Sequence, residues 1–251
     1  MRILTYNVNG LRSTFDKGFN KIINQLDPDL VFLQETRMKE KDLKFRWDSS
    51  YLLYLNAATQ AGYSGTAFLT KKEPIGIKFN FADEDDGRSI FVEYKGFYLV
   101  GIYSPNSGVS LVKLANRLLF DSAIQKIVGA MDEKKPVILC GDLNVVANDI
   151  DSRNDQKRTR PPGFTEVERY SFAKLLTSGE GFVDVFREKY PTLIEYSFYK
   201  NRIAKLNNSG IRLDYFIVSR RLMRHVRDVW HCKEYSPSDH VPVCMDIKLK
   251  W

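Results

Sequence analysis

Short runs of apolar, β-branched and aromatic residues recur along most of this 251-residue chain, and they limit its fold more than any other feature. Such runs predict β-strands, and the expected strands are RILTYNV, DLVFLQE, YLLYLNA, GTAFLTK, IGIKFNF, SIFVEY, FYLVGIYS, PVILCGD, LDYFIVS and VCMDIKL. Adjacent runs such as SIFVEYKGFYLVGIYS indicate hairpins. Hairpins and an excess of strands do not fit a simple parallel α/β sheet. The sequence instead favours two packed sheets flanked by helices, in a single domain over residues 1–251.

Three stretches have the apolar spacing of helices, and we expect each to face the core. The first two stripes are Phe19, Ile22, Ile23 and Leu26, and then Leu111, Leu114, Ala115, Leu118 and Leu119. The third helix is expected to begin at TEVE, where Thr165 and Glu168 have the spacing of a capping box. The polar stretch NDIDSRNDQKRTRPPGF separates strand-like runs, so it predicts an ordered insertion loop.

The charge of the chain indicates an anionic partner. Lys and Arg total 38 against 31 Asp and Glu, which gives a net charge of +7 and a pI near 9.2. Nucleic acid is the commonest such partner, followed by membrane surfaces and phosphorylated metabolites. Charge alone leaves open the alternative that the excess serves only solubility.

The cysteines and the N-terminus indicate an intracellular protein. Cys140, Cys232 and Cys244 have no C-x-x-C spacing, and an odd number cannot form a fully paired framework. Cys140 and Cys244 lie in apolar runs, so we expect them to be buried thiols in a reducing compartment. The start, MRILTYNV, leads directly into a strand without the features of a secretion signal, and no apolar run has the length of a membrane span.

Polar side chains follow the ends of many predicted strands. They are Asn7, Asn9, Glu35, Tyr103, Asn106, Asp142, Asn144, Asp214, Asp239 and His240. A single Asp or Asn at such a position is commonly a turn residue or a cap. A whole set is harder to assign to turns, because burying unpaired carboxylates costs several kcal/mol each. The set therefore predicts a site with a metal ion or internal hydrogen-bond partners.

The residue types indicate phosphodiester hydrolysis. Carboxylates with amides are hard oxygen ligands that suit Mg²⁺ or Mn²⁺ and not zinc, and no HExxH motif is present. The SDH motif suits an imidazole that a carboxylate orients. The set supplies an activated water, a cation site and donors to phosphate oxygens. Neither a G-x-S-x-G elbow nor a P-loop or Rossmann fingerprint occurs.

The ordered motifs NVNGLR, LQET, GYSGTAFLTK, GR, YSPNSG, CGDLNV, GFTEVER, GIRLDYFIVS and SDHVPV resemble the exonuclease III family of apurinic/apyrimidinic (AP) endonucleases. GDLN or SDH alone is shared with phosphatases, sphingomyelinases and deoxyribonuclease I relatives of the endonuclease–exonuclease–phosphatase fold. LQET, GYSG, GFTEVER and RLDYF together narrow the resemblance to the AP endonucleases. The resemblance implies a four-layer αββα sandwich, in which two mixed β-sheets are flanked by helices.

The resemblance also implies one or two divalent ions, Mg²⁺ or alternatively Mn²⁺. Glu35 would bind the first ion with Asn7 and Asp239 nearby. Asp142, Asn144 and His240 would be the ligands of a second ion.

The implied catalytic roles centre on an attacking water and a phosphate. Asp142 would activate the water, supported by Asn7 and Asn144. His240, paired with Asp214, would contact a phosphate oxygen. Tyr103 and Asn106 would hold the phosphate or assist the leaving oxygen.

The implied substrate is double-stranded DNA with abasic or 3′-blocked lesions. Cleavage 5′ to an abasic site would leave a 3′-hydroxyl, as in base excision repair, alongside 3′→5′ exonuclease and 3′-phosphatase or phosphodiesterase activity. A missing base lets the sugar flip out at lower cost. The residues implied for substrate binding are Tyr63, Arg88, Arg212, Phe198 and Ile211, and RNDQKRTR suggests further phosphate contacts. We interpret SRRLMRHVR as a solvated helix face. We expect a monomer in the nucleus of a eukaryote or otherwise in the cytoplasm, neither secreted nor membrane-bound.

Four positions depart from the family pattern. Ile211 replaces a usual tryptophan, which predicts weaker discrimination against intact nucleotides, and Val109 replaces an arginine that enters the duplex in some members. Asn9 replaces an aspartate, and Leu4 replaces the cysteine of redox-active members, so we expect no redox function. Two other interpretations stay open: a nucleic-acid-binding module without catalysis, and a phosphoinositide or sphingolipid phosphodiesterase.

Overall fold

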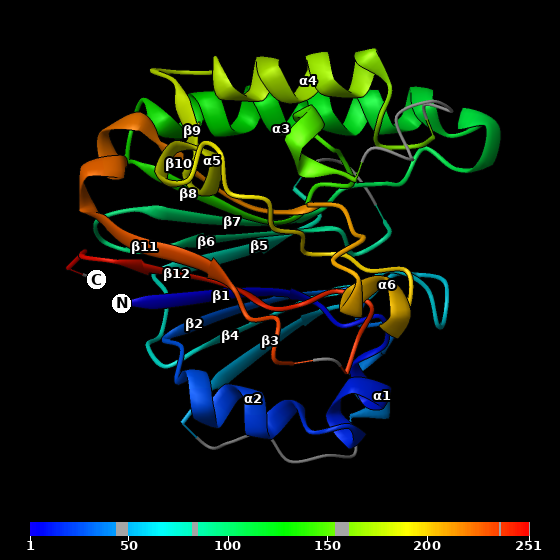
Figure 1. The fold of residues 1–251 in the computed structure, drawn as a ribbon. Coiled ribbons are helices and arrows are strands. Elements are labelled where there is room, and N and C mark those ends of the chain that lie inside the picture. The colour runs from blue at the N-terminus through cyan, green and yellow to red at the C-terminus, as the bar shows by residue number, and fades with distance from the viewer. Residues whose placement is uncertain (44–49, 82–84, 154–160, 236, 251) are drawn as a thin grey trace.

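The computed structural model describes residues 1–43, 50–81, 85–153, 161–235 and 237–250, and they form two stacked six-stranded sheets between helices (Figure 1). In spatial order, the first sheet holds β11 (Val226–His231), β12 (Val243–Ile247), β1 (Arg2–Asn7), β2 (Leu30–Gln34), β4 (Thr66–Thr70) and β3 (Leu52–Asn56). The second sheet holds β5 (Gly76–Phe79), β6 (Ser89–Glu93), β7 (Tyr98–Tyr103), β8 (Val137–Asp142), β10 (Asp214–Ser219) and β9 (Phe182–Asp184). Both sheets are mixed, because β1–β2 and β7–β8 are parallel and the other pairs antiparallel. The predicted αββα sandwich is confirmed.

Helices cover the outer faces of the two sheets and also lie at the edges of the sandwich. They are α1 (Leu11–Asp16), α2 (Phe19–Leu26), α3 (Leu114–Asp132), α4 (Glu166–Leu176), α5 (Val185–Lys189) and α6 (Arg202–Leu206). In Figure 1, α1 and α2 lie below the first sheet, and α3 and α4 lie above the second. Among the described helices, none combines the length and the apolar character needed to cross a bilayer.

The two sheets meet across an apolar core that contains Phe32, Phe68, Leu99, Ile138 and Phe216. At one point they approach closely, because a Cβ atom placed on Gly101 of β7 would lie 2.2 Å from the Phe32 ring of β2. The three cysteines are buried with free thiols, and the sulfur atoms of Cys232 and Cys244 lie 3.8 Å apart. The predicted burial of Cys140 and Cys244 is confirmed.

Two of the three helix predictions are confirmed. All four apolar residues of α2 are buried, and Thr165 and Glu168 form the capping box of α4. The stripe expected for α3 is wrong in phase. Leu119 is 72% exposed, and the inward positions are Arg117, Phe120, Ile124 and Val128. Leu111 precedes the helix in a 3₁₀ turn with positive φ, so it does not set the helical phase.

Every predicted strand forms, and the structure adds β9 and β11. The segment SRRLMRHVR forms a short 3₁₀ helix (Arg220–His225) with Arg220 and Arg224 exposed, and its last two residues begin strand β11, which was not predicted. Its charged residues concealed the alternation of a strand. Of the predicted insertion loop and its basic segment RNDQKRTR, residues 154–160 lie outside the described residues.

Candidate active site

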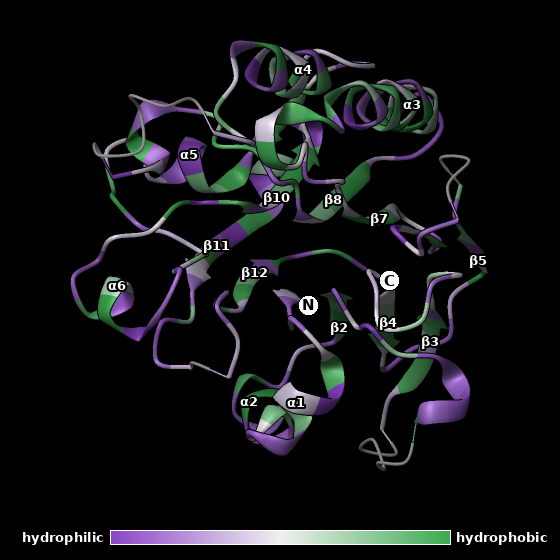
Figure 2. Cartoon of the chain, turned by 90° about the vertical axis from the view of Figure 1, so that its right-hand side faces the viewer, coloured by the Kyte–Doolittle hydropathy of each residue, from purple (hydrophilic) through white to green (hydrophobic). Residues whose placement is uncertain are grey.

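The strand ends that carry the predicted polar residues meet at one edge of the sandwich. Asn7 and Gln34 are neighbours at the ends of the parallel strands β1 and β2, and Tyr103 and Asp142 are neighbours at the ends of β7 and β8. Because β10 runs antiparallel to β8, its first residue Asp214 pairs with Asp142 at the same edge. Figure 2 looks onto this edge, where hydrophilic loops surround the hydrophobic strands.

Asp142, His240 and Asp214 form the buried centre of this edge. The Nδ1 atom of His240 lies 2.7 Å from Asp214 Oδ2, and its Nε2 atom lies 3.9 Å from Asp142 Oδ2. All three residues are buried, and a phenyl edge of Phe198 covers the imidazole with ring centroids 5.0 Å apart. The imidazole therefore has one fixed orientation between two carboxylates.

Burial and charge together shift the pKa values of this centre. Burial, with Asp214 nearby, raises the pKa of Asp142 well above its ordinary value. Burial alone would lower the pKa of His240, but Asp214 and Asp142 outweigh it and raise that pKa. His240 is therefore an imidazolium at neutral pH, and Asp142 is a more basic carboxylate than usual.

Two asparagines hold Asp142. Asn7 Nδ2 donates to Oδ2 at 2.9 Å, and the main-chain amide of Asn144 donates to Oδ1 at 2.9 Å. Asn144 has a φ of 47°, in the left-handed region, and its side chain bonds to the Ser104 carbonyl and to Asn106. The two loops after β7 and β8 are thus joined through Asn144.

Glu35 follows β2 and is bound on both carboxylate oxygens. Tyr103 donates its hydroxyl proton to Oε1, and Arg37 pairs with Oε2 at 2.6 Å. Burial, followed by the charges of Glu35 and Asp142, raises the pKa of Tyr103 well above its ordinary value. Tyr103 is therefore a neutral donor between the two acids.

Asp239 lies on the loop before β12 and is tied to the first loop of the chain. Asn9 Nδ2 donates to Asp239 Oδ1 at 3.0 Å, and the Ser238 hydroxyl donates to the same oxygen at 3.1 Å. The main-chain amide of Asn9 also donates to Asn7 Oδ1. Asn9 thus links the two loops by a hydrogen bond. An aspartate at this position could not donate this bond, and its negative charge would repel Asp239.

The donor chemistry of this edge fits a divalent ion. Ligand atoms of Asp142, Asp214 and His240 all lie within 4.8 Å of one another. Within the described part of the chain, Asp214 Oδ1 is buried without a hydrogen-bond partner, which leaves an acceptor for a cation or a water. Oxygen donors dominate the set, as Mg²⁺ and Mn²⁺ prefer.

The predicted DNA-binding residues flank this centre. Arg88 Nη2 donates to the Tyr63 hydroxyl at 2.9 Å, and its guanidinium stacks on Tyr103. A groove of about 790 Å³ runs past these side chains and Asn106. Ile211 packs with Val146, Phe164 and Leu213 beside Phe198, so it offers no flat surface for stacking.

The sequence matches the Endonuclease/Exonuclease/phosphatase family over residues 4–240. The chain belongs to this family. It is 36% identical to the exodeoxyribonuclease of Bacillus subtilis (strain 168), over 99% of the chain and 100% of that protein. It is 35% identical to the DNA repair nuclease APEX1 of Danio rerio, over 99% of the chain and 83% of that protein. Among solved structures, the AP endonuclease LMAP of Leishmania major superposes with a TM-score of 0.89 at 27% identity, over 99% of this chain and 88% of that one.

In this member of the Endonuclease/Exonuclease/phosphatase family, the predicted DNA contact of Arg212 is wrong. Arg212 was expected to grip the DNA strand, but its side chain is 0% exposed. Its guanidinium bonds to Asp151 at 2.7 and 2.9 Å and to Asp184 at 2.7 and 3.1 Å. Two carboxylates occupy its donors, so Arg212 joins the insertion loop to β9 and β10 and does not reach a ligand.

Sequence reasoning missed the residue that supports Asp214. The Ser197 hydroxyl accepts hydrogen bonds from the amides of Leu213 and Asp214, at 2.9 and 3.0 Å. It is fully buried. A serine within YSFY gives no local signal of this contact, because its partners are 16 and 17 residues away.

Proposed function

We propose that this protein is a metal-dependent DNA-repair nuclease, a single domain that cleaves the phosphodiester 5′ to abasic sites in duplex DNA and leaves a 3′-hydroxyl. The accompanying activities would be 3′→5′ exonuclease and removal of 3′-blocking groups. The observation that carries the proposal is the buried Asp142–His240–Asp214 centre, in a chain that matches named DNA nucleases along its whole length.

Asp142 would take the proton of the attacking water. Its raised pKa, from burial and Asp214, suits a general base near neutral pH, and Asn7 and Asn144 orient its two oxygens. His240 would donate from Nε2 to a nonbridging phosphate oxygen while Asp214 holds Nδ1. Tyr103 and Asn106, beside this centre, would hold the phosphate or assist the leaving oxygen.

Two ligand sets are available for the cation. Glu35 with Asn7 and Asp239 forms the first set, and Asp142, Asn144 and His240 the second. In the second set His240 would have to release its Nε2 proton to bind a metal, and the carboxylates of Asp214 and Asp142 oppose that release. A bound Mg²⁺ would supply positive charge for the phosphate in the transition state.

A duplex oligonucleotide with one tetrahydrofuran abasic analogue tests the proposal. We expect a nick 5′ to the analogue with Mg²⁺ and none with EDTA, and parallel intact and 3′-phosphate duplexes measure the accompanying activities. Binding without a nick under any divalent ion would indicate a nucleic-acid-binding module. Phosphate release from an inositol phosphate, without a nick, would indicate a lipid phosphodiesterase.

Asp142→Asn is the sharpest test of the proposed water activation. The amide keeps the size of the side chain but cannot take a proton, so we expect the single-turnover nicking rate to fall by at least about 10²-fold. Binding of the uncut duplex in EDTA should change little. A near-normal rate in this variant would contradict the role given to Asp142.

We further propose that the protein acts as an intracellular monomer. The three free, buried cysteines suit a reducing compartment.

The net charge of +7 suits a DNA partner, and the affinity for DNA should fall steeply as the salt concentration rises.

A further inference from the structure

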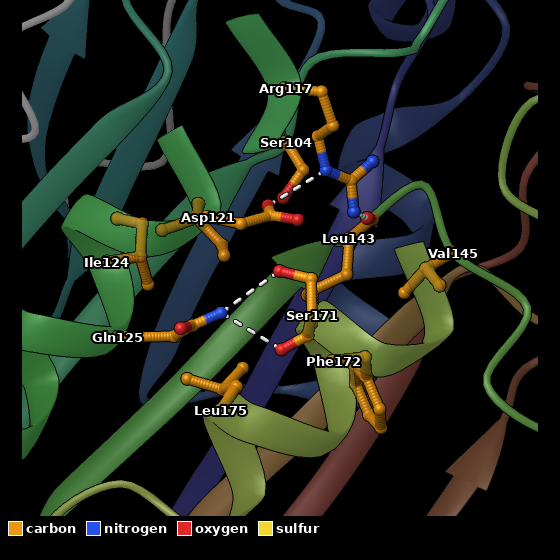
Figure 3. Close-up of a pocket in the computed structure, with 11 residues that line it drawn as sticks. Ser104, Arg117, Asp121, Ile124, Gln125, Leu143, Val145, Ser171, Phe172 and Leu175 are labelled. Carbon is orange, nitrogen blue, oxygen red and sulfur yellow. Dashed lines mark hydrogen bonds and ion pairs between the residues drawn. The ribbon is translucent and has the colours of Figure 1, made fainter. Parts of the chain in front are cut away.

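Arg117 lies behind the two loops of the candidate site, on the inward face of α3. Its side chain is only 2% exposed, which is unusual for an arginine and requires partners for its charge. Figure 3 shows the guanidinium between α3 and Leu143, next to Ser104 and Asp121. Its Nε atom donates to Asp121 Oδ1 at 2.8 Å, an ion pair one helical turn away.

Both Nη atoms of Arg117 donate to carbonyls of the two loops. Nη1 donates to the Pro105 carbonyl at 3.0 Å and to the Asn144 carbonyl at 3.1 Å, and Nη2 donates to the Leu143 carbonyl at 2.7 Å. Pro105 stands between Tyr103 and Asn106, and Leu143 stands between Asp142 and Asn144. One planar group therefore joins the segments that carry four of the proposed site residues.

The left-handed backbone of Asn144 gives this support a purpose. A φ of 47° is unfavourable for most residues with a side chain, although asparagine adopts it more readily than others, and surrounding contacts help to hold it. The Arg117 bond to the Asn144 carbonyl and the Asn144 side-chain bond to Ser104 hold it from opposite sides. A lysine has one compact ammonium and cannot span three carbonyls and a carboxylate.

We propose that Arg117 is a positioning residue for phosphodiester hydrolysis, which sets the spacing between Asp142 and the Tyr103–Asn106 loop without touching DNA. The inference rests on the proposed function, since it concerns the same site. Loss of the Arg117 side chain would misplace the water-activating carboxylate of Asp142 relative to the phosphate. Such a misplacement lowers kcat and leaves substrate affinity nearly intact.

The test compares Arg117→Lys and Arg117→Met with the wild type. We expect kcat to fall about 10²-fold for Arg117→Met and by a smaller factor for Arg117→Lys, with KM and the Kd of the uncut abasic duplex within about threefold of wild type. Thermal unfolding and near-ultraviolet circular dichroism establish the folded fraction of each variant.

Gln125→Leu is the matched control. Gln125 lies two turns further along α3 and lines the same small cavity of about 20 Å³, but it bonds to Ser171 of α4 and not to either loop (Figure 3). The Gln125→Leu variant should have a lower free energy of unfolding than the wild type but an unchanged kcat. An equal loss of kcat in this control, unchanged kcat in both Arg117 variants, or a loss confined to KM would overturn the proposal. Failure of both Arg117 variants to unfold cooperatively would assign the residue to fold stability and overturn it as well.

A parallel assay on bis(p-nitrophenyl) phosphate separates the two proposals. If the wild type hydrolyses this simple phosphodiester but does not nick the abasic duplex, the proposed substrate is wrong. The Arg117 comparison then proceeds on the simple ester, with the same expected fall in kcat.

Discussion

Arg212 is a buried cation whose charge is balanced by two carboxylates. Its guanidinium is fully buried, bonds to the carboxylates of Asp151 and Asp184, and lies 4.3 Å from the centroid of the Tyr215 ring. A second arginine, Arg187, pairs with Asp151. Burial alone would lower the pKa of Arg212, but these carboxylates hold it well above its ordinary value, so the charge persists and the two acids depend on it.

Removal of this charge should destabilise the fold and not the DNA complex. Arg212→Met leaves two buried carboxylates with fewer partners, and we expect a loss of about 3–5 kcal/mol in the free energy of unfolding. Urea denaturation measures it, and Arg224→Met, an exposed arginine of the 3₁₀ helix, should stay within about 0.5 kcal/mol of wild type. Wild-type stability with weakened DNA binding would restore the substrate role expected from the sequence.

At the scale of elements, the contact between β7 and β2 controls how closely the sheets approach. Gly101 faces the Phe32 ring, and a methyl group there would overlap the ring at 2.2 Å. β7 ends in Tyr103 and β2 leads to Glu35, so this contact joins the two strands that carry these site residues.

Gly101→Ala should therefore destabilise the protein by about 1–3 kcal/mol through overpacking. Gly76→Ala is the control in the same sheet, because its added Cβ would meet only the Glu93 carboxylate at 3.9 Å, an ordinary contact. Equal melting temperatures for the two variants would show that the sheets can separate at no cost.

The strands and the site-bearing ends were predictable because they depend on local alternation and on residue type. Strand β9 was not, since three residues are too few for a period, and β11 was obscured by the basic segment before it. The apolar stripe of α3 misled because Arg117, which is not part of the leucine pattern, faces inward while Leu119 is exposed. The contacts of Arg117 and Ser197 depend on juxtaposition across the fold, for which a single sequence has no local signal.

At the scale of the whole molecule, His231 links stability to pH. It lies buried on β11 against Phe186, with Nδ1 3.3 Å from Glu195 Oε2, and Glu195 also pairs with Lys233. Burial lowers the pKa of His231, although the bond to Glu195 opposes the change. As pH falls below about 6.5, the unfolded chain binds this proton before the folded protein does, so folding stability decreases.

His231→Gln should remove the contribution of this histidine to the pH dependence of folding stability. We expect the fall in melting temperature between about pH 7.5 and pH 5.5 to be smaller in the variant than in the wild type. His225→Gln makes the same exchange at a half-buried histidine outside this aromatic pocket and should keep the wild-type difference. An unchanged difference in His231→Gln would mean that other groups carry the acid sensitivity.

The pairing of β1 with β12 brings the first and last strands of the chain together in one sheet. While the ribosome is still extending the chain, β1 lacks this neighbour, and Asp142 and Asp214 emerge well before the imidazole that lies between them. A nascent chain that ends before His240 therefore carries the two acids without their cation, and the centre is complete only once His240 has been synthesised.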